Sequence, residues 1–179
     1  VLVLALAYKV FFGEPASAGF FEFGGATMHT TYNVKVVGQD LEKGDRQRLE
    51  RVVKERLDFV NAQMSSYHKG GEIYRLNEAA VNSPCKVSRE VVHVLEAAIK
   101  ISEQTGGAFD VTVGPLIKLW GFYHKVPLSS MPPNEAIDKT LASIGYRGLV
   151  VDRDAGTVTK TVEGLEVDLS AIAKGRAVD

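Results

Sequence analysis

The residues best suited to chemistry lie in the closing stretch 166–179, EVDLSAIAKGRAVD. The pattern predicts a short strand over residues 164–169 that ends on Asp168, then a tight turn of small residues and the start of a helix. A helix N-terminus has unpaired N–H groups and partial positive charge, which suit a phosphate. Lys174 in the first turn opposes the helix dipole by about 0.3–1 kcal/mol, a conflict that a bound anion would remove. An ordinary exposed lysine is the alternative reading.

A second group of residues with chemical potential follows the two glycines Gly106 and Gly107. Phe109 could stack on a planar ligand, and the neighbouring Asp110 could accept a hydrogen bond from it. A helix end followed by a strand start is the alternative for the same residues. The sequence contains no Gly-x-Ser-x-Gly nucleophile pattern, no GxxxxGK[ST] phosphate loop and no GxGxxG fingerprint.

Composition excludes several other classes of function. A formal net charge of −1 and the lack of a Lys/Arg run argue against nucleic-acid binding. The single cysteine, Cys85, rules out an intramolecular disulfide and argues against a cysteine-based zinc site. The four histidines are scattered and suggest no metal cluster.

Apolar periodicity predicts the elements that must position these residues. We expect a strand over 26–38 after a break at Gly24-Gly25, and a helix from Asp45 to about Met64. A polar loop and a short helix follow, and Ser88 then caps a second amphipathic helix that Gly106-Gly107 terminates.

The remaining elements are short. Pro115 suits the first position of a small helix, and residues 137–144 form another that Gly145 closes. Residues 149–151 and 157–162 form a hairpin around 154–156. Helices interspersed with hairpins and single strands predict an α+β fold with a mixed or antiparallel sheet.

The N-terminal stretch differs from the rest. Residues 1–12 are almost wholly apolar, and Ala16-Ser17-Ala18 has the form of a signal-peptidase site. Twelve residues are too few to span a bilayer, which takes about 20. We therefore expect residues 1–23 to be the remnant of a signal peptide or an N-terminal membrane anchor, and residues 24–179 to form the folded portion.

Four blocks of sequence together resemble the ApbE family of flavin transferases. GATMHTTY (25–32) is similar to the family's Gly-x-x-Met-Gly-Thr block, and MSSY (64–67) with EIYRLN (72–77) is similar to its second block. GAFDVTVGPL (107–116) with LWGF (119–122) resembles the third, and DLSAIAKG (168–175) is nearly identical to the fourth. Two departures are His29, where Gly is usual, and the pair His68-Lys69, where acidic or neutral residues are common.

The resemblance implies an ApbE-like fold and a set of ligand contacts. The residues that it implies contact FAD are Met28, Tyr67, Ala108, Phe109, Asp110, Asp168 and Lys174. It also implies that the backbone carbonyl of Ala171 is a ligand of Mg²⁺. In the family the carboxylate metal ligands and a proposed catalytic histidine come from a later half. We therefore expect this chain to be the N-terminal part of a longer protein and to be inactive by itself.

The function that the resemblance implies is Mg²⁺-dependent FAD:protein FMN transfer. FMN moves from FAD to a Thr or Ser hydroxyl of an acceptor protein, which can be a subunit of a membrane respiratory complex, and AMP is released. The alternatives are hydrolysis of FAD to FMN and AMP and a non-catalytic flavin-binding module. The expected location is the periplasmic side of a bacterial cell envelope, free or anchored to the inner membrane.

Overall fold

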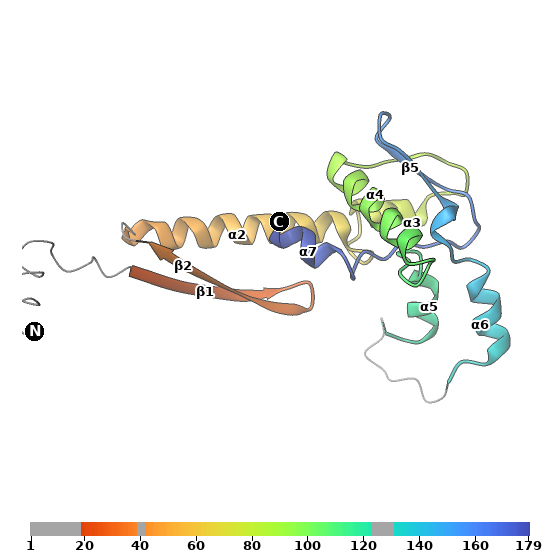
Figure 1. Ribbon diagram of the computed structural model, residues 1–179, viewed down its shortest axis with the longest axis horizontal. Helices are drawn as coiled ribbons and strands as arrows, with labels where there is room; N and C mark the ends of the chain where they lie inside the picture. Colours follow the sequence, from red (N-terminus) through yellow and green to blue (C-terminus); the bar gives the residue numbers. More distant parts are fainter. Residues whose placement is uncertain (1–18, 39–41, 123–130) are drawn as a thin grey trace, which may run out of the picture. The chain divides into compact units, whose positions relative to one another are not determined.

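A computed structural model describes residues 19–38, 42–122 and 131–179 of the chain (Figure 1). The fold is α+β, as predicted: helices accompany one two-stranded and one three-stranded sheet, both antiparallel. The chain divides into two compact units, residues 1–57 and 58–179, and helix α2 contributes residues to both.

The first unit contains a long hairpin of β1 (Gly19–Thr27) and β2 (Thr30–Gly38). The break predicted at Gly24-Gly25 is wrong, because both glycines lie inside β1 and pair with Asn33 and Tyr32. A Cβ at Gly24 would lie 2.5 Å from the Tyr32 carbonyl oxygen, so glycine lets the two backbones approach here. β1 begins at Gly19, before the expected boundary at residue 24, and residues 1–18 of the expected leader lie outside the described residues.

Met28 and His29 form the two-residue turn between these strands. Their φ angles are +47° and +57°, in the left-handed region that hairpin turns of this length require at both positions. Glycine occupies this region without a steric penalty, whereas other residues pay about 1–2 kcal/mol. The Gly that is usual at position 29 in the family therefore has a conformational explanation, and His29 occupies the same conformation at a cost.

Helix α2 (Lys43–Met64) begins two residues before the predicted start at Asp45. Asp45 instead accepts a hydrogen bond from the Glu42 N–H at 3.0 Å, near the helix start. Val60 and Met64 are buried, as their spacing predicted. Among the described residues, no helix combines the length and the apolar character needed to cross a membrane.

The described residues of the second unit form five further α-helices. The Ser88 hydroxyl accepts a hydrogen bond from the Val91 N–H at 3.3 Å, so the predicted N-cap is confirmed. Gly106 and Gly107 adopt φ of +62° and +86° and end that helix, as predicted. The helices of this unit are α3 (Glu72–Glu78), α4 (Arg89–Gln104), α5 (Gly114–Leu119), α6 (Asn134–Leu141) and α7 (Ala173–Val178).

Two helix boundaries differ from the prediction. Pro115 is the second residue of α5 rather than the first. Helix α6 ends at Leu141, before Gly145, and residues 142–143 form a turn. Gly145 has φ +148° and precedes a 3-10 turn over Tyr146–Gly148.

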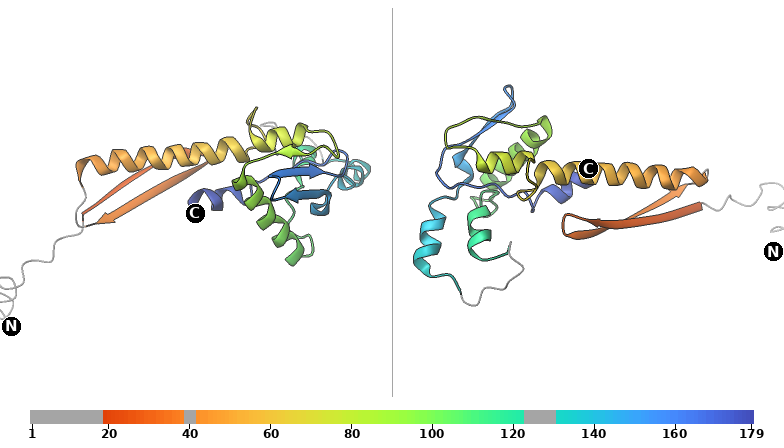
Figure 2. Two further views of the ribbon diagram at one scale, coloured as in Figure 1. Left: turned by 90° about the horizontal axis from the view of Figure 1, so that it is seen from above. Right: turned by 180° about the vertical axis from the view of Figure 1, so that it is seen from behind.

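The three-stranded sheet has the order β3–β5–β4 (Figure 2). Strands β4 (Leu149–Asp152) and β5 (Thr157–Lys160) form the predicted hairpin, and β3 (Cys85–Lys86) is too short to show a periodicity. Helix α4 contacts β4, and α3 contacts β3. The buried apolar side chains of this core include Ile73, Leu76, Val91, Leu95 and Val158.

The strand predicted over residues 164–169 is wrong. This segment makes a single parallel bridge, between Val113 and Glu166. The reason is that the side-chain amide of Asn77 pairs with both backbone groups of Val167, at 2.8 and 2.9 Å. A side chain thus takes the place that a neighbouring strand would occupy.

The close approach of α5 to this segment gives a test of packing. A Cβ at Gly114 would lie 2.9 Å from the Glu166 carbonyl oxygen and 3.1 Å from its Cβ. We expect Gly114→Ala to lower the free energy of unfolding by about 1–3 kcal/mol, because extra volume in a packed site forces backbone shifts. Urea denaturation measures the change. Gly44→Ala is the control, since nothing lies within 4 Å of a Cβ at Gly44; equal effects of the two changes would contradict the packing argument.

Candidate functional site

The candidate site is centred on Asp168, which is only 4% exposed. Its backbone N–H donates to the Val111 carbonyl at 2.7 Å, which ties it to the segment that follows Asp110. One carboxylate oxygen, Oδ1, accepts a hydrogen bond from the Ser170 N–H at 2.8 Å. The acid therefore shapes the turn that leads from the extended segment into α7.

Residues 64–67, far away in the sequence, reach the other oxygen of the same carboxylate. The Ser66 hydroxyl donates to Asp168 Oδ2 at 3.3 Å. The next residue, Tyr67, is 47% exposed. Burial of part of the phenol and the negative charge of Asp168 together raise the pKa of Tyr67 to about 12, although a hydrogen bond with Ser66 acts in the opposite direction. The structure thus brings together two predicted ligand contacts, Tyr67 and Asp168.

Asp110 is held by three hydrogen bonds from the chain itself. Its Oδ1 accepts from the Thr112 N–H at 2.7 Å and from the Thr112 hydroxyl at 2.6 Å, and its Oδ2 accepts from the Tyr146 N–H at 2.9 Å. Thr112 is fully buried and also accepts from the Gly145 N–H at 2.8 Å. The carboxylate therefore has a structural role, joining its loop to the turn at 145–146. The predicted contact with FAD stays a prediction, and replacing Asp110 would change this loop as well.

The neighbouring Ala108 and Phe109 are more accessible. Ala108 is exposed and Phe109 is half-buried. The Phe109 N–H donates to the Thr105 hydroxyl at 3.1 Å, which fixes the start of the loop against the end of α4. Both residues are accessible to a ligand, and their contact with a flavin stays a prediction.

The closing turn confirms the predicted place of Lys174 in the first turn of α7. Lys174 is exposed, and its Nζ donates to the Ser170 carbonyl at 3.0 Å. Within the described chain, no backbone carbonyl accepts from the N–H groups of Ala171, Lys174 or Gly175. Free N–H groups and an ammonium at one turn are the donors that a phosphate would need.

The same turn provides little for a metal ion. No backbone N–H of the described residues donates to the carbonyl of Ala171, which leaves this oxygen available as a ligand. Across residues 19–38, 42–122 and 131–179, no three His, Cys, Asp or Glu side chains lie close enough to hold an ion. Mg²⁺ requires near-octahedral oxygen coordination, so these residues do not by themselves fit an Mg²⁺ site.

Met28 is the remaining predicted contact, and it belongs to the first unit. It lies at the tip of the β1–β2 hairpin, beside His29. The other predicted residues all belong to the second unit.

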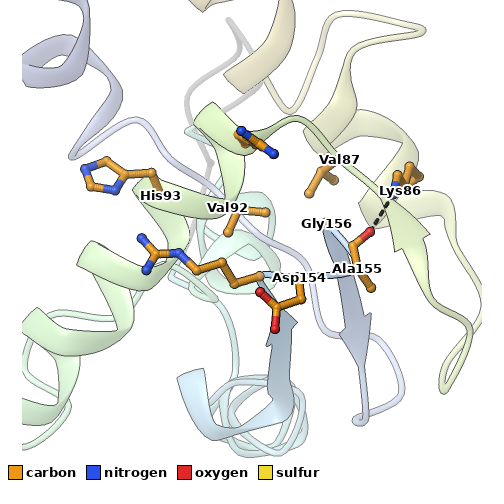
Figure 3. Close-up of a pocket in the computed structure, with 9 residues that line it drawn as sticks. Lys86, Val87, Val92, His93, Asp154, Ala155 and Gly156 are labelled. Carbon is orange, nitrogen blue, oxygen red and sulfur yellow. Dashed lines mark hydrogen bonds between the residues drawn. The ribbon is translucent and has the colours of Figure 1, made fainter.

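A separate groove of about 730 Å³ lies beside the first turn of α4 (Figure 3). Lys86, Arg89 and Arg153 line it, but Asp154 does as well, and Arg153 pairs with Glu96 at 3.3 Å. Lys86 donates to the Ala155 carbonyl (dashed in Figure 3). Arg153 is thus paired and Asp154 adds a negative charge to the lining, and none of the residues predicted to contact FAD lines the groove. We place no ligand in this groove.

Sequence reasoning missed four polar residues that support the site: Ser66, Asn77, Thr112 and Lys160. A signal existed for Lys160, which lies two residues after the buried Val158 on β5 and so shares its inward face. Asn77 lay inside a recognised block, but no pattern indicated that its side chain pairs with a backbone far along the chain.

The pKa of Tyr67 gives a test of the contact with Asp168. We expect Asp168→Asn to lower the pKa of Tyr67 from about 12 only partly toward 10, because burial is the larger cause and the charge the smaller one. Phenolate absorbance as a function of pH measures it, with Tyr67→Phe identifying the signal. If the pKa of Tyr67 is unchanged in Asp168→Asn, the charge of Asp168 does not act on the phenol.

Comparison with known proteins identifies the family of the chain. The sequence profile of the ApbE family matches residues 28–179. A Vibrio cholerae protein named FAD:protein FMN transferase is 39% identical over 155 residues, covering 87% of this chain and 46% of that protein. The protein of the same name from Escherichia coli K12 is 31% identical over 157 residues, covering 87% of this chain and 44% of its own length.

Solved structures show the same fold. The flavin transferase ApbE from Vibrio cholerae superposes with a TM-score of 0.82 at 37% identity, covering 90% of this chain and 52% of that one. The ApbE protein from Thermotoga maritima gives 0.80 at 27% identity, covering 90% and 50%. The chain spans about half the length of the curated relatives it matches. On the match of the family profile to most of its residues, the chain belongs to the ApbE family.

Proposed function

We propose that this protein is part of an FAD:protein FMN transferase. A Thr or Ser hydroxyl oxygen of an acceptor protein attacks the phosphorus of the FMN half of FAD. A new P–O ester bond forms, and the bond from that phosphorus to the bridging oxygen breaks. AMP leaves with the bridging oxygen, and the hydroxyl proton passes to a base or solvent.

The observation that carries the proposal is the convergence on Asp168 of family blocks that are distant in sequence. Ser66 touches its carboxylate, the segment after Asp110 pairs with its backbone, and its own turn leads into Lys174. These blocks lie within residues 28–179, which match the family profile, and relatives over this part of the chain are named for flavin transfer.

The side chains of the site have roles suited to this chemistry. With a pKa of about 12, Tyr67 stays protonated at neutral pH and offers a neutral hydrogen-bond donor to a ligand. Lys174 and the free N–H groups of its turn offer positive charge to the phosphates. For Asp168 we propose one of three roles: to hold an adenine or ribose edge, to orient the lysine, or to tune a metal-bound water.

Mg²⁺ is the cation that we propose for the complete protein. When bound, it would neutralise charge on the phosphoryl oxygens. The Ala171 carbonyl is the ligand that we assign to it in this chain. The other oxygen ligands would come from FAD, water or further protein groups, and we derive no step of the reaction through the metal.

The proposed location is the periplasmic side of a bacterial cell envelope, free or anchored to the inner membrane, and the proposed acceptor is a protein such as a membrane respiratory subunit. The proposed location rests on the apolar stretch 1–12 and the Ala16-Ser17-Ala18 site, both outside the described residues. The proposed acceptor rests on the resemblance to the ApbE family. Cell fractionation of the full-length protein tests the location, and recovery in the cytosol would contradict it.

The reaction can be tested with the full-length protein. The first step is to determine the complete reading frame on both sides of residues 1–179. We expect AMP to be released from FAD only when Mg²⁺ and a Thr-bearing acceptor protein are both present, because the hydroxyl is the attacking group. Chelation of the metal should abolish release. Chromatography measures AMP, and mass spectrometry measures the FMN added to the acceptor.

The other outcomes identify the rival functions. AMP released without an acceptor would show hydrolysis, with water in place of the hydroxyl. FAD binding without any AMP would indicate a flavin-binding module.

The role of Lys174 is tested by the affinity of the full-length protein for FAD. Hydrogen bonds to charged groups contribute about 1.5–3 kcal/mol, so Lys174→Ala should weaken binding by roughly 10- to 100-fold. Flavin fluorescence titration measures the affinity. Lys100→Ala, which removes an exposed lysine of α4, is the control and should leave it unchanged. If the affinity of Lys174→Ala also stays at the wild-type level, Lys174 does not face the phosphates.

A further inference from the structure

Lys160, the last residue of β5, is a lysine that is only 5% exposed. Its Nζ donates to the backbone carbonyl of Asn77 at 2.6 Å. Asn77 is the penultimate residue of α3, and the last carbonyls of a helix have no partner within the helix. Lys160 therefore supplies the hydrogen bond, and a positive charge, that this helix end requires.

The side chain of Asn77 continues the connection. Its Nδ2 donates to the Val167 carbonyl at 2.9 Å, and its Oδ1 accepts from the Val167 N–H at 2.8 Å. Both backbone polar groups of the fully buried Val167 are thereby satisfied by one rigid amide. The next residue is Asp168, whose own N–H donates to the Val111 carbonyl at 2.7 Å. The backbone around Asp168 is held from two directions.

A buried lysine in this position carries a desolvation cost that its hydrogen bond to the Asn77 carbonyl must offset. Burial disfavours its charged form and lowers the pKa of Lys160, an effect that the carboxylates of Glu166, Glu163 and Glu78, with Cys85, partly oppose. An apolar side chain would fill the space without that desolvation cost. Val158, on the same face of β5, shows that apolar residues are accommodated there.

We propose that Lys160 and Asn77 are positioning residues for Asp168. Lys160 fixes the end of α3, Asn77 fixes Val167, and the Asp168 carboxylate is thereby kept beside Ser66 and Tyr67. The ordering of Asp168 stands on the geometry alone, whereas its consequence for FAD rests on the proposed function.

The test uses three variants of the full-length protein and amide hydrogen exchange. Lys160→Met removes the donor but keeps the length of the side chain, and Asn77→Asp keeps the shape but loses the donor to Val167. Lys86→Met is the matched control, because Lys86 lies on the same sheet and its Nζ also donates to a backbone carbonyl, that of Ala155.

We expect exchange at Val167 and Asp168 to become at least tenfold faster in Lys160→Met, while Leu95 in the core of α4 keeps its rate. In Asn77→Asp, which keeps the acceptor of the Val167 N–H, we expect the same increase at Asp168. Lys86→Met should change none of these rates. Lys160→Arg, which retains a donor, should restore part of the protection. Should Lys160→Met fail to fold, Asn77→Asp gives the same readout at Asp168.

Two results would overturn the proposal. One is unchanged exchange at Val167 and Asp168; the other is a uniform increase across the second unit, which would mean that Lys160 supports only global stability. A second arm measures FAD affinity, which should fall about tenfold in Lys160→Met and stay constant in Lys86→Met. Faster exchange with unaltered FAD affinity would refute the link to the ligand. If the wild-type protein binds no FAD, the proposed function fails, while the exchange experiment still decides the positioning role.

Discussion

The buried carboxylate of Asp168 is the constraint on which the second unit depends. A charged group with 4% exposure must be surrounded by donors, because an unpaired buried charge costs several kcal/mol. Ser66 and Ser170 supply two of those donors, and each comes from a different part of the chain. Meeting that requirement draws the loop after α2 and the turn before α7 to the same place.

A second acid has the same kind of role at a neighbouring loop. Asp110 accepts hydrogen bonds from Thr112 and Tyr146, as Asp168 accepts them from Ser66 and Ser170. Two of the residues predicted to contact FAD, Asp110 and Asp168, thus also hold their loops in place by hydrogen bonds. Substitutions at these acids change both properties, which is why Tyr67 and Lys174, whose side chains are more exposed, are the better probes of function.

Much of the fold could be predicted, because local signals coincide with it. Ser88 and Gly106 mark the ends of α4, and the turn residues 154–156 mark the β4–β5 hairpin. The strand expected over residues 164–169 failed because a side chain, Asn77, took the place of a partner strand, and sequence periodicity carries no information on such a pairing. The break predicted at Gly24 failed for a similar reason. This glycine lies within a strand and lets the paired strand approach closely. The place of Lys174 could be predicted locally, whereas the approach of Tyr67 to Asp168 depends on tertiary contacts.

The register of the β4–β5 hairpin has a consequence for assembly of the site. Val150 pairs with Thr159 and Leu149 with Lys160, which turns the Lys160 side chain inward. Because side chains alternate between the two faces of a strand, a slip of one residue would point this ammonium at solvent and leave the end of α3 uncapped. A chain folded in that wrong register would keep most of its backbone pairing but lose the link between Lys160 and α3. The correct register of this hairpin is thus a condition for the positioning that we propose for Asp168.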